Sequence, residues 1–211
     1  MSEEIRLAAS ALVGRDGPDG LEVLVLERGA SSRFLPGYVA FPGGSTDGAD
    51  EALARRWFGS STEAGRACAV RELVEEVSLV LTSTGLGPGR SLDPIDALPP
   101  SSDQLVEVAH WVAPEHVPVR FDARYYAVRS PADLMPHPDG SETADAWWAA
   151  PSSLLEDWQR GRRRLFWPTF FTMRAIAECR STADLLDLRL QTREPDDDEL
   201  DRLPRSTFWQ D

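Results

Sequence analysis

The chain of 211 residues is long enough for one sizeable core, and its 42% hydrophobic and 27% charged residues are typical of a globular protein. A formal net charge of −13 argues against binding along a nucleic-acid backbone, which requires clustered cations. The two cysteines are far apart in the sequence, which argues against a zinc site. The sequence shows neither a basic and apolar leader nor a long apolar run, so export and a membrane segment are not expected. These features favour a cytoplasmic protein.

The first part of the chain is expected to form a hairpin, a loop and two helices. Residues 5–28 contain two β-rich runs around the turn sequence DGPDG. A Gly- and Pro-rich loop follows, and then a short helix that should end at Gly59, a residue suited to a helix C-terminus. A second helix is predicted from about 62 to 77, with Ser60 and Glu63 spaced as a capping box.

The second part of the chain is expected to alternate strands with helices. Residues 82–105 are rich in Gly, Pro and Ser, and we interpret them as a connection. Two strands are predicted within 106–130, and a strand, a Pro turn and a short helix within 141–161. Residues 168–188 have the spacing of one amphipathic helix or a pair.

Three glutamates gather on one side of the second predicted helix. Glu72, Glu75 and Glu76 are spaced i, i+3 and i+4, so their side chains can converge on one point. The alternative is a solvent-exposed helix face with an Arg71–Glu75 ion pair. That arrangement would not offset the repulsion between Glu72 and Glu76. A hard divalent cation takes carboxylate oxygens as ligands and suits a substrate with phosphoryl groups.

The run EAGRACAVRELVEEVSL and the upstream FPGG resemble the Nudix box, in which Glu, seven residues, Arg-Glu, an aliphatic, any residue and Glu-Glu are followed by Gly. Two departures are visible. Eighteen residues separate Gly44 from Glu63 where the family has five, and Ser78 stands where the family has glycine. Asp50 keeps the five-residue spacing and competes with Glu63 for the first carboxylate role. The box would then span about 43–79.

The resemblance implies a metal-dependent active site. The implied catalytic set consists of charged residues of the box and one later glutamate: Glu63, Arg71, Glu72, Glu75, Glu76 and Glu142. The ligands of Mg²⁺ or Mn²⁺ would be Glu72, Glu75, Glu76 and the backbone carbonyl of Gly43. Arg71 would be held against Glu63 or a neighbouring carboxylate. Glu142 would be a catalytic base or an extra ligand, and an exposed turn glutamate is the alternative.

The sequence ahead of the box resembles that of coenzyme A diphosphatases, in which an Arg, a second Arg and a Gly precede FPGG. Arg28, Arg33 and Gly37 fit that pattern, and the helix inserted at about 48–59 agrees with one branch of those enzymes. The resemblance implies hydrolysis of coenzyme A or an acyl-CoA to 3′,5′-ADP and 4′-phosphopantetheine. The alternatives are ADP-ribose or dinucleotide hydrolysis and a nucleotide-sensing module without turnover.

Arginines are the candidate substrate-binding residues, because a guanidinium binds phosphate through two parallel hydrogen bonds. We select Arg33, Arg120 and Arg124, and a surface ion pair is the alternative for an arginine on a strand. Phe166 and Trp167, at the start of a predicted helix, are either substrate contacts or core residues.

The family resemblance also implies a fold. It is an α/β Nudix fold, an α/β/α sandwich with a mixed β-sheet and a loop-helix-loop catalytic motif. We expect one domain over residues 1–190 and an acidic arm at 191–211, whose two aromatic residues could dock on the body or on a second subunit of a homodimer. The expected partner is a small-molecule diphosphate, with no nucleic acid and no membrane.

Overall fold

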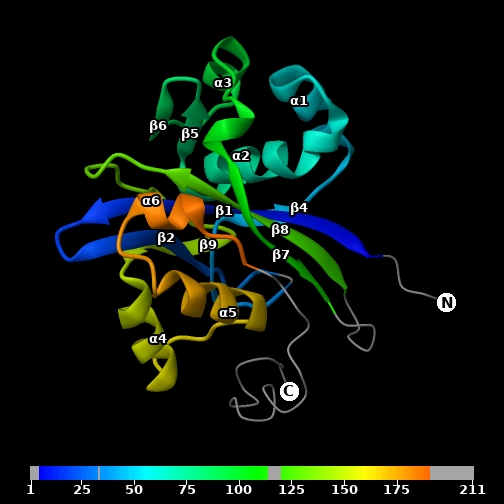
Figure 1. Ribbon diagram of the computed structural model, residues 1–211. Helices are drawn as coiled ribbons and strands as arrows, with labels where there is room; N and C mark the ends of the chain where they lie inside the picture. The colour runs from blue at the N-terminus through cyan, green and yellow to red at the C-terminus, as the bar shows by residue number, and fades with distance from the viewer. Residues whose placement is uncertain (1–4, 33, 114–119, 191–211) are drawn as a thin grey trace.

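A mixed β-sheet with helices on both faces forms the body of the protein (Figure 1). The computed structural model describes residues 5–32, 34–113 and 120–190. The sheet contains seven strands: β1 (Arg6–Gly17), β2 (Gly20–Arg28), β3 (Val39–Ala40), β4 (Gly43–Ser45), β7 (Val106–Val112), β8 (Phe121–Arg129) and β9 (Thr143–Ala149). β1 pairs with β8 in parallel and the other pairings are antiparallel, so the expected α/β fold with a mixed sheet is confirmed.

The central strand β1 has two successive partners on one edge. Residues 8–10 pair with β4, and residues 14–17 pair with β2, which confirms the hairpin expected over 5–28. The other edge of β1 lies along β8 for nearly its whole length. β4 is therefore held against the middle of the sheet, and it contains the glycines of the FPGG sequence.

Two hydrophobic clusters, one on each face of the sheet, follow the period-two alternation of the strands. Leu24 and Leu26 of β2 pack on the face that also receives the central helix of the box. Val23 and Val25 of the same strand pack on the opposite face, against the helices that follow β9. The sheet is thus covered on both sides, with the glutamate helix on one of them.

Two helices come from the box region. α1 (Gly48–Phe58) ends at Gly59, whose φ of 79° is left-handed, as the sequence predicts. α2 (Ala64–Val77) follows a 3₁₀ turn at Ser61–Glu63. The predicted Ser60–Glu63 capping box is wrong, because this tighter turn brings the amide of Thr62 to the Ser60 hydroxyl, at 3.2 Å.

The end of α2 departs from the family pattern in sequence but keeps the backbone that a glycine would supply. Ser78 has a φ of 56°, in the left-handed region. Its hydroxyl donates a hydrogen bond to the carbonyl oxygen of His137, at 2.9 Å. This bond offsets part of the cost of a side chain at a positive φ.

The segment interpreted as a connection holds more structure than the sequence predicts. β5 (Leu79–Thr82) and β6 (Gly85–Pro88) form a separate hairpin, and α3 (Asp93–Ala97) is a short helix. Val80 and Leu86 are buried in the same cluster as α2. Pairing with β5, whose apolar sequence LVLT precedes the segment, and burial of Leu86 therefore stabilise β6, whose composition favours a loop.

The remaining helices cover the other face of the sheet. They are α4 (Pro151–Gln159), α5 (Trp167–Ile176) and α6 (Thr182–Asp187), so residues 168–188 form a pair of helices. Within the three described ranges, every helix is too short or too polar to be a membrane span. The acidic arm at 191–211 lies outside the described residues.

Candidate active site

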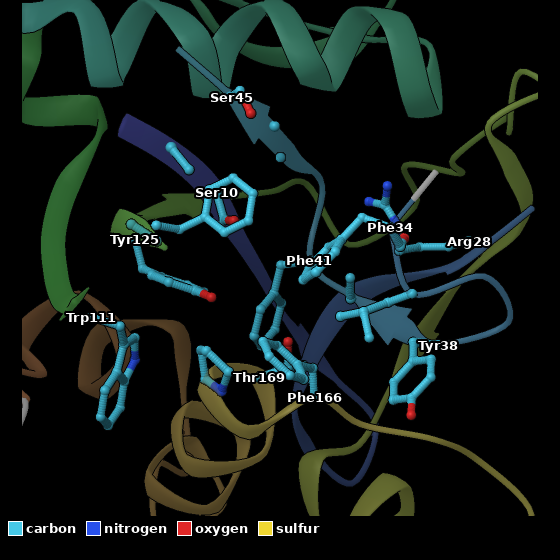
Figure 2. A pocket seen from close by; sticks show the side chains of 18 of the residues that line it. Ser10, Arg28, Phe34, Tyr38, Phe41, Ser45, Trp111, Tyr125, Phe166 and Thr169 are labelled. Carbon is cyan, nitrogen blue, oxygen red and sulfur yellow. Dashed lines mark hydrogen bonds between the residues drawn. The ribbon is translucent and has the colours of Figure 1, made fainter. Parts of the chain in front are cut away.

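A pocket of about 540 Å³ is lined by residues of α2, of the sheet and of the start of α5 (Figure 2). Glu72 and Glu76 of α2, Glu142 and Arg28 line one part of it. Aromatic side chains line the rest: Phe34, Tyr38, Phe41, Trp111, Phe121, Tyr125, Phe166 and Trp167. The pocket therefore joins a charged part to an apolar part.

Two glycines let β4 approach its neighbours closely, Gly44 on the side of α2 and Gly43 on the side of β1. A Cβ atom on Gly44 would lie 2.1 Å from Oε1 of Glu72, and one on Gly43 would lie 2.4 Å from Oγ of Ser10. The Gly43 amide donates a hydrogen bond to Oε2 of Glu76, at 2.8 Å. Both glycines of FPGG are thus required by contact distance, and they bring the backbone of β4 to the two buried carboxylates.

Burial controls the ionisation of these two carboxylates. Burial first, and then the neighbouring charge of Glu72, raises the pKa of Glu76 to about 8. Burial also raises the pKa of Glu72, against the guanidinium of Arg71, which lowers it. A bound cation would favour the ionised form of both groups.

Arg71 organises the other side of the glutamate helix. Its Nε and Nη2 atoms donate to the two oxygens of Asp50, at 2.9 and 3.1 Å, and the Asp50 side chain is fully buried. Its Nη1 atom donates to Glu72 at 2.9 Å and to Glu75 at 2.6 Å. Glu63 instead pairs with Arg66, one turn along α2. Of the two candidates from the sequence, the structure brings Asp50 and not Glu63 against Arg71.

The predicted metal ligands are only partly assembled. Glu72 and Glu76 both line the pocket, whereas Glu75 is half exposed and bonded to Arg71. Among the described residues, no three His, Cys, Asp or Glu side chains are grouped closely enough to hold a metal ion. The two buried carboxylates nevertheless have the hard-oxygen chemistry that Mg²⁺ and Mn²⁺ prefer, so the donor set fits such an ion.

Glu142 lies at the pocket, as the sequence predicts, although its side chain is exposed. Its charge is one of those that raise the pKa of Glu76. The loop after β2 holds its backbone, because the Gly29 amide and the Ser32 hydroxyl donate to the Glu142 carbonyl, at 2.7 and 3.2 Å. The position agrees with a base or an extra ligand near Glu76.

Arg28 is a pocket cation that the list of substrate-binding candidates omits. Its Nε atom donates to the carbonyl of Phe34 at 2.8 Å, and none of the described carboxylates forms an ion pair with it. Its charge lowers the pKa of Glu76. Its place in the motif ahead of FPGG was the signal that could have selected it.

Arg120 and Arg124, two of the three selected arginines, do not line the pocket. Arg124 forms two hydrogen bonds with Glu107, at 3.0 and 2.9 Å, and Arg120 donates to the Ala113 carbonyl at 3.2 Å. Arg124 alternates along β8 with Ala123 and Tyr125, which face the pocket, so its side chain lies on the other face. Arg124 therefore forms a surface ion pair, which was the alternative to a substrate-binding role. Arg33 lies outside the described residues.

Comparisons with known proteins agree with this geometry, although no family model matches the chain. The Caenorhabditis elegans protein named "Putative nudix hydrolase 7" is 25% identical over 174 residues, which are 74% of this chain and 56% of that protein. The chain thus spans little more than half the length of that relative.

Solved structures extend the likeness to the fold. A NUDIX hydrolase from Alicyclobacillus acidocaldarius is 26% identical with a TM-score of 0.72, over 90% of this chain and 99% of that one. A C. elegans Ap4A hydrolase is 13% identical with a TM-score of 0.50, over 81% and 93% of the two chains. With the spacing of the box and the approach of α2 to Gly44, the Alicyclobacillus structure and the C. elegans relative make the chain similar to Nudix hydrolases in sequence, and the solved structures make it similar to them in fold.

Proposed function

We propose that the protein hydrolyses the diphosphate bond of a nucleoside diphosphate derivative with the help of Mg²⁺ or Mn²⁺. The observation that carries the proposal is the placement of Glu72 and Glu76, two carboxylates buried against a pocket. Arg71 pairs with Glu72, whereas Glu76 accepts only the Gly43 amide among the hydrogen bonds of the described residues. Burying the two carboxylates side by side is therefore costly unless a further cation or a proton neutralises the second charge. A divalent cation would supply that charge where a diphosphate can reach it.

The residues around the pocket would have different roles in hydrolysis. Glu72, Glu76 and the Gly43 carbonyl would hold the cation, and Glu75 would join them after leaving Arg71. When bound, such an ion neutralises phosphoryl oxygens and lowers the pKa of a water. Glu142, at the open side of the pocket, would accept the proton of the attacking water.

Two arginines would act in different ways. Arg71 positions α2, because its guanidinium is fixed by the buried Asp50 and reaches Glu72 on the same helix. Arg28 would contact the substrate, because it lines the pocket and its Nη atoms form none of the hydrogen bonds of the described residues. A diphosphate oxygen is the natural acceptor for those donors.

We propose coenzyme A or an acyl-CoA as the substrate. The support is the arrangement ahead of FPGG: Arg28 of that motif lines the pocket, and Gly37 has a left-handed φ of 73° in the loop that leads to β3. Glu63 has a lesser role in this proposal, since its carboxylate lies against Arg66.

The test compares substrates and products directly. Coenzyme A, dephospho-coenzyme A, ADP-ribose and a diadenosine polyphosphate are incubated with the protein and Mg²⁺, Mn²⁺ or EDTA, and products are separated by mass. We expect 3′,5′-ADP and phosphopantetheine from coenzyme A, with loss of turnover in EDTA and in Glu72→Gln. Glu51→Gln, on the exposed face of α1, is the matched control.

Other outcomes would redirect the proposal. Preferential cleavage of ADP-ribose or of the dinucleotide would keep the chemistry and replace the substrate. No turnover of any diphosphate, with metal bound and the fold intact, would favour a nucleotide-sensing module. If Arg33 recognises the 3′-phosphate, Arg33→Ala should narrow the difference between coenzyme A and dephospho-coenzyme A.

A further inference from the structure

The part of the pocket away from α2 is built differently from the carboxylate part. We call it the aromatic end and define it by Phe34, Trp111, Phe121, Phe166 and Trp167. Figure 2 shows Trp111, Phe166 and Thr169 on this side, with Ser45 and α2 on the other. Arg28 is the one cationic side chain among the described residues of the whole pocket wall.

We infer that the aromatic end binds an uncharged, apolar substituent of the diphosphate substrate, and that Thr169 donates a hydrogen bond to a carbonyl oxygen of that substituent. The inference rests on the proposed function for the diphosphate itself. To that function the inference adds the chemical class of the group that is attached to the diphosphate.

Thr169 is the polar group that points to a ligand. The residue is only 6% exposed and lines the pocket, and its hydroxyl forms none of the hydrogen bonds of the described residues. The hydroxyl oxygen is open to the pocket and is not among the fully buried oxygens that lack a partner, so a ligand acceptor could take the place of water there.

The start of α5 adds a second reason for an acceptor atom. This helix has ten residues, its N-cap residue Phe166 provides no side-chain hydrogen bond, and its first turn contains no acidic residue. The unpaired amides of a helix N-terminus attract the negative end of a dipole. A neutral carbonyl satisfies that attraction without bringing a full charge among aromatic rings, which would be costly.

The arrangement of the rings argues against a sandwiched base. The centroids of Phe34 and Phe121 are 5.5 Å apart with planes at 54°, and those of Phe34 and Phe166 are 5.7 Å apart with planes at 87°. A base held between two rings needs near-parallel planes separated by two stacking distances. These rings contact one another and form a single apolar wall instead.

Small residues leave the space that such a substituent would fill. Ala123 of β8 lies between Phe121 and Tyr125 on the pocket-facing side of the strand, and Ala113 also lines the pocket. A larger residue at Ala123 would therefore fill the aromatic end without touching α2.

Binding of non-hydrolysable ligands tests the inference. The probes are ADP analogues with a methylene bridge in the diphosphate, whose terminal phosphate is esterified with a methyl group or with acylaminoethyl groups of increasing chain length. Dissociation constants come from calorimetry in Mg²⁺. We expect the Kd to fall roughly threefold for each added methylene until the end is filled.

Two variants separate the parts of the inference. Ala123→Leu should remove the dependence of the Kd on chain length, whereas Ala49→Leu, on the exposed face of α1, should leave that dependence unchanged. Thr169→Val should weaken the amide-bearing probes about tenfold and not the matched ethers, at the upper range for a lost hydrogen bond.

Different results would contradict the different parts of the inference. A Kd independent of chain length, or tighter binding of a probe with a phosphate-bearing arm, would overturn the apolar subsite. Equal effects of Thr169→Val on amides and ethers would overturn the role of Thr169. The probes are not hydrolysed, so binding and turnover are measured separately. Binding that depends on chain length, together with no turnover of any diphosphate, would refute only the proposed function. Turnover of a diphosphate, together with binding that does not depend on chain length, would refute only this inference.

Discussion

Asp50 and Arg71 form a bidentate ion pair that joins the inserted helix to the glutamate helix. The Nε–Oδ1 and Nη2–Oδ2 distances are 2.9 and 3.1 Å, and the Asp50 side chain is completely buried. The same carboxylate accepts the Asp47 amide at the start of α1, at 3.0 Å. The insertion therefore brings its own carboxylate to the arginine that precedes Glu72.

Removing the charge of Asp50 should destabilise the protein more than removing that of Glu63. Asp50→Asn leaves the Arg71 guanidinium without its buried partner and should lower the free energy of unfolding by about 3 kcal/mol. Glu63→Gln removes a partly exposed pair and should cost less than about 1 kcal/mol. Urea unfolding measures both. Equal losses, or a greater loss of turnover in Glu63→Gln, would show that Glu63 is the true partner.

Gly44 should be intolerant of even one extra carbon. In Gly44→Ala the new Cβ would lie 2.1 Å from Oε1 of Glu72, so the carboxylate must move, and turnover should fall about a hundredfold. Gly48→Ala is the matched control, because a Cβ there meets no atom within 4 Å and the residue begins α1. Steady-state kinetics with circular dichroism separates the two; a fully active Gly44→Ala would contradict the close approach.

The metal-free protein should lose stability as the pH rises. Burial raises the pKa of Glu76 from 4.5 to about 8, so between these values the folded state keeps a proton that the unfolded state has released. The stabilisation is fully present below about pH 4.5 and is lost as the pH rises through about 8. The groups around this carboxyl are Glu72, Glu142, Arg28 and the Gly43 amide.

Thermal unfolding from pH 5 to pH 9 measures this dependence. The midpoint should fall with pH in EDTA and fall less in millimolar Mg²⁺, which binds the ionised carboxylates of the folded state. Glu76→Gln should flatten the profile, whereas Glu75→Gln, on a half-exposed side chain, should not. An unchanged profile in Glu76→Gln would assign the dependence to another group.

Substitutions of Ser78 should separate the effect of its left-handed backbone on stability from the effect of its hydroxyl hydrogen bond. Ser78→Ala keeps a side chain at a φ of 56° and loses the bond to His137, so it should destabilise the protein by about 1 kcal/mol. Ser78→Gly loses the same bond but relieves the left-handed backbone, so it should be nearly neutral. Urea unfolding of the two variants gives the difference, and a glycine variant less stable than the alanine variant would contradict this account.

Local signals in the sequence predicted the elements that depend on local chemistry. The hairpin of residues 5–28 follows from its turn residues and alternating strands, and Gly59 ends α1 where a left-handed residue is needed. The carboxylate spacing on α2 likewise placed Glu72 and Glu76 on one side. Each of these features is decided within a few residues.

Features that depend on tertiary packing were not predictable in the same way. Asp50 and Glu63 were equal candidates because the answer depends on how α1 folds back onto α2. The β5–β6 hairpin is stabilised by burial of Val80 and Leu86, and the Gly- and Pro-rich composition of β6 did not indicate a strand. For Arg124, alternation along β8 was visible, but which face would meet the pocket was not.

The parallel pairing of β1 with β8 has a kinetic consequence. It joins residues 6–14 to residues 121–129, and β1 also holds β4 with its two glycines. Contacts so far apart in sequence form slowly, because a long loop must be closed before they stabilise the chain. We therefore expect the carboxylate site, which β4 and β1 support, to form late in folding. A cation that binds it should retard unfolding far more than it accelerates folding.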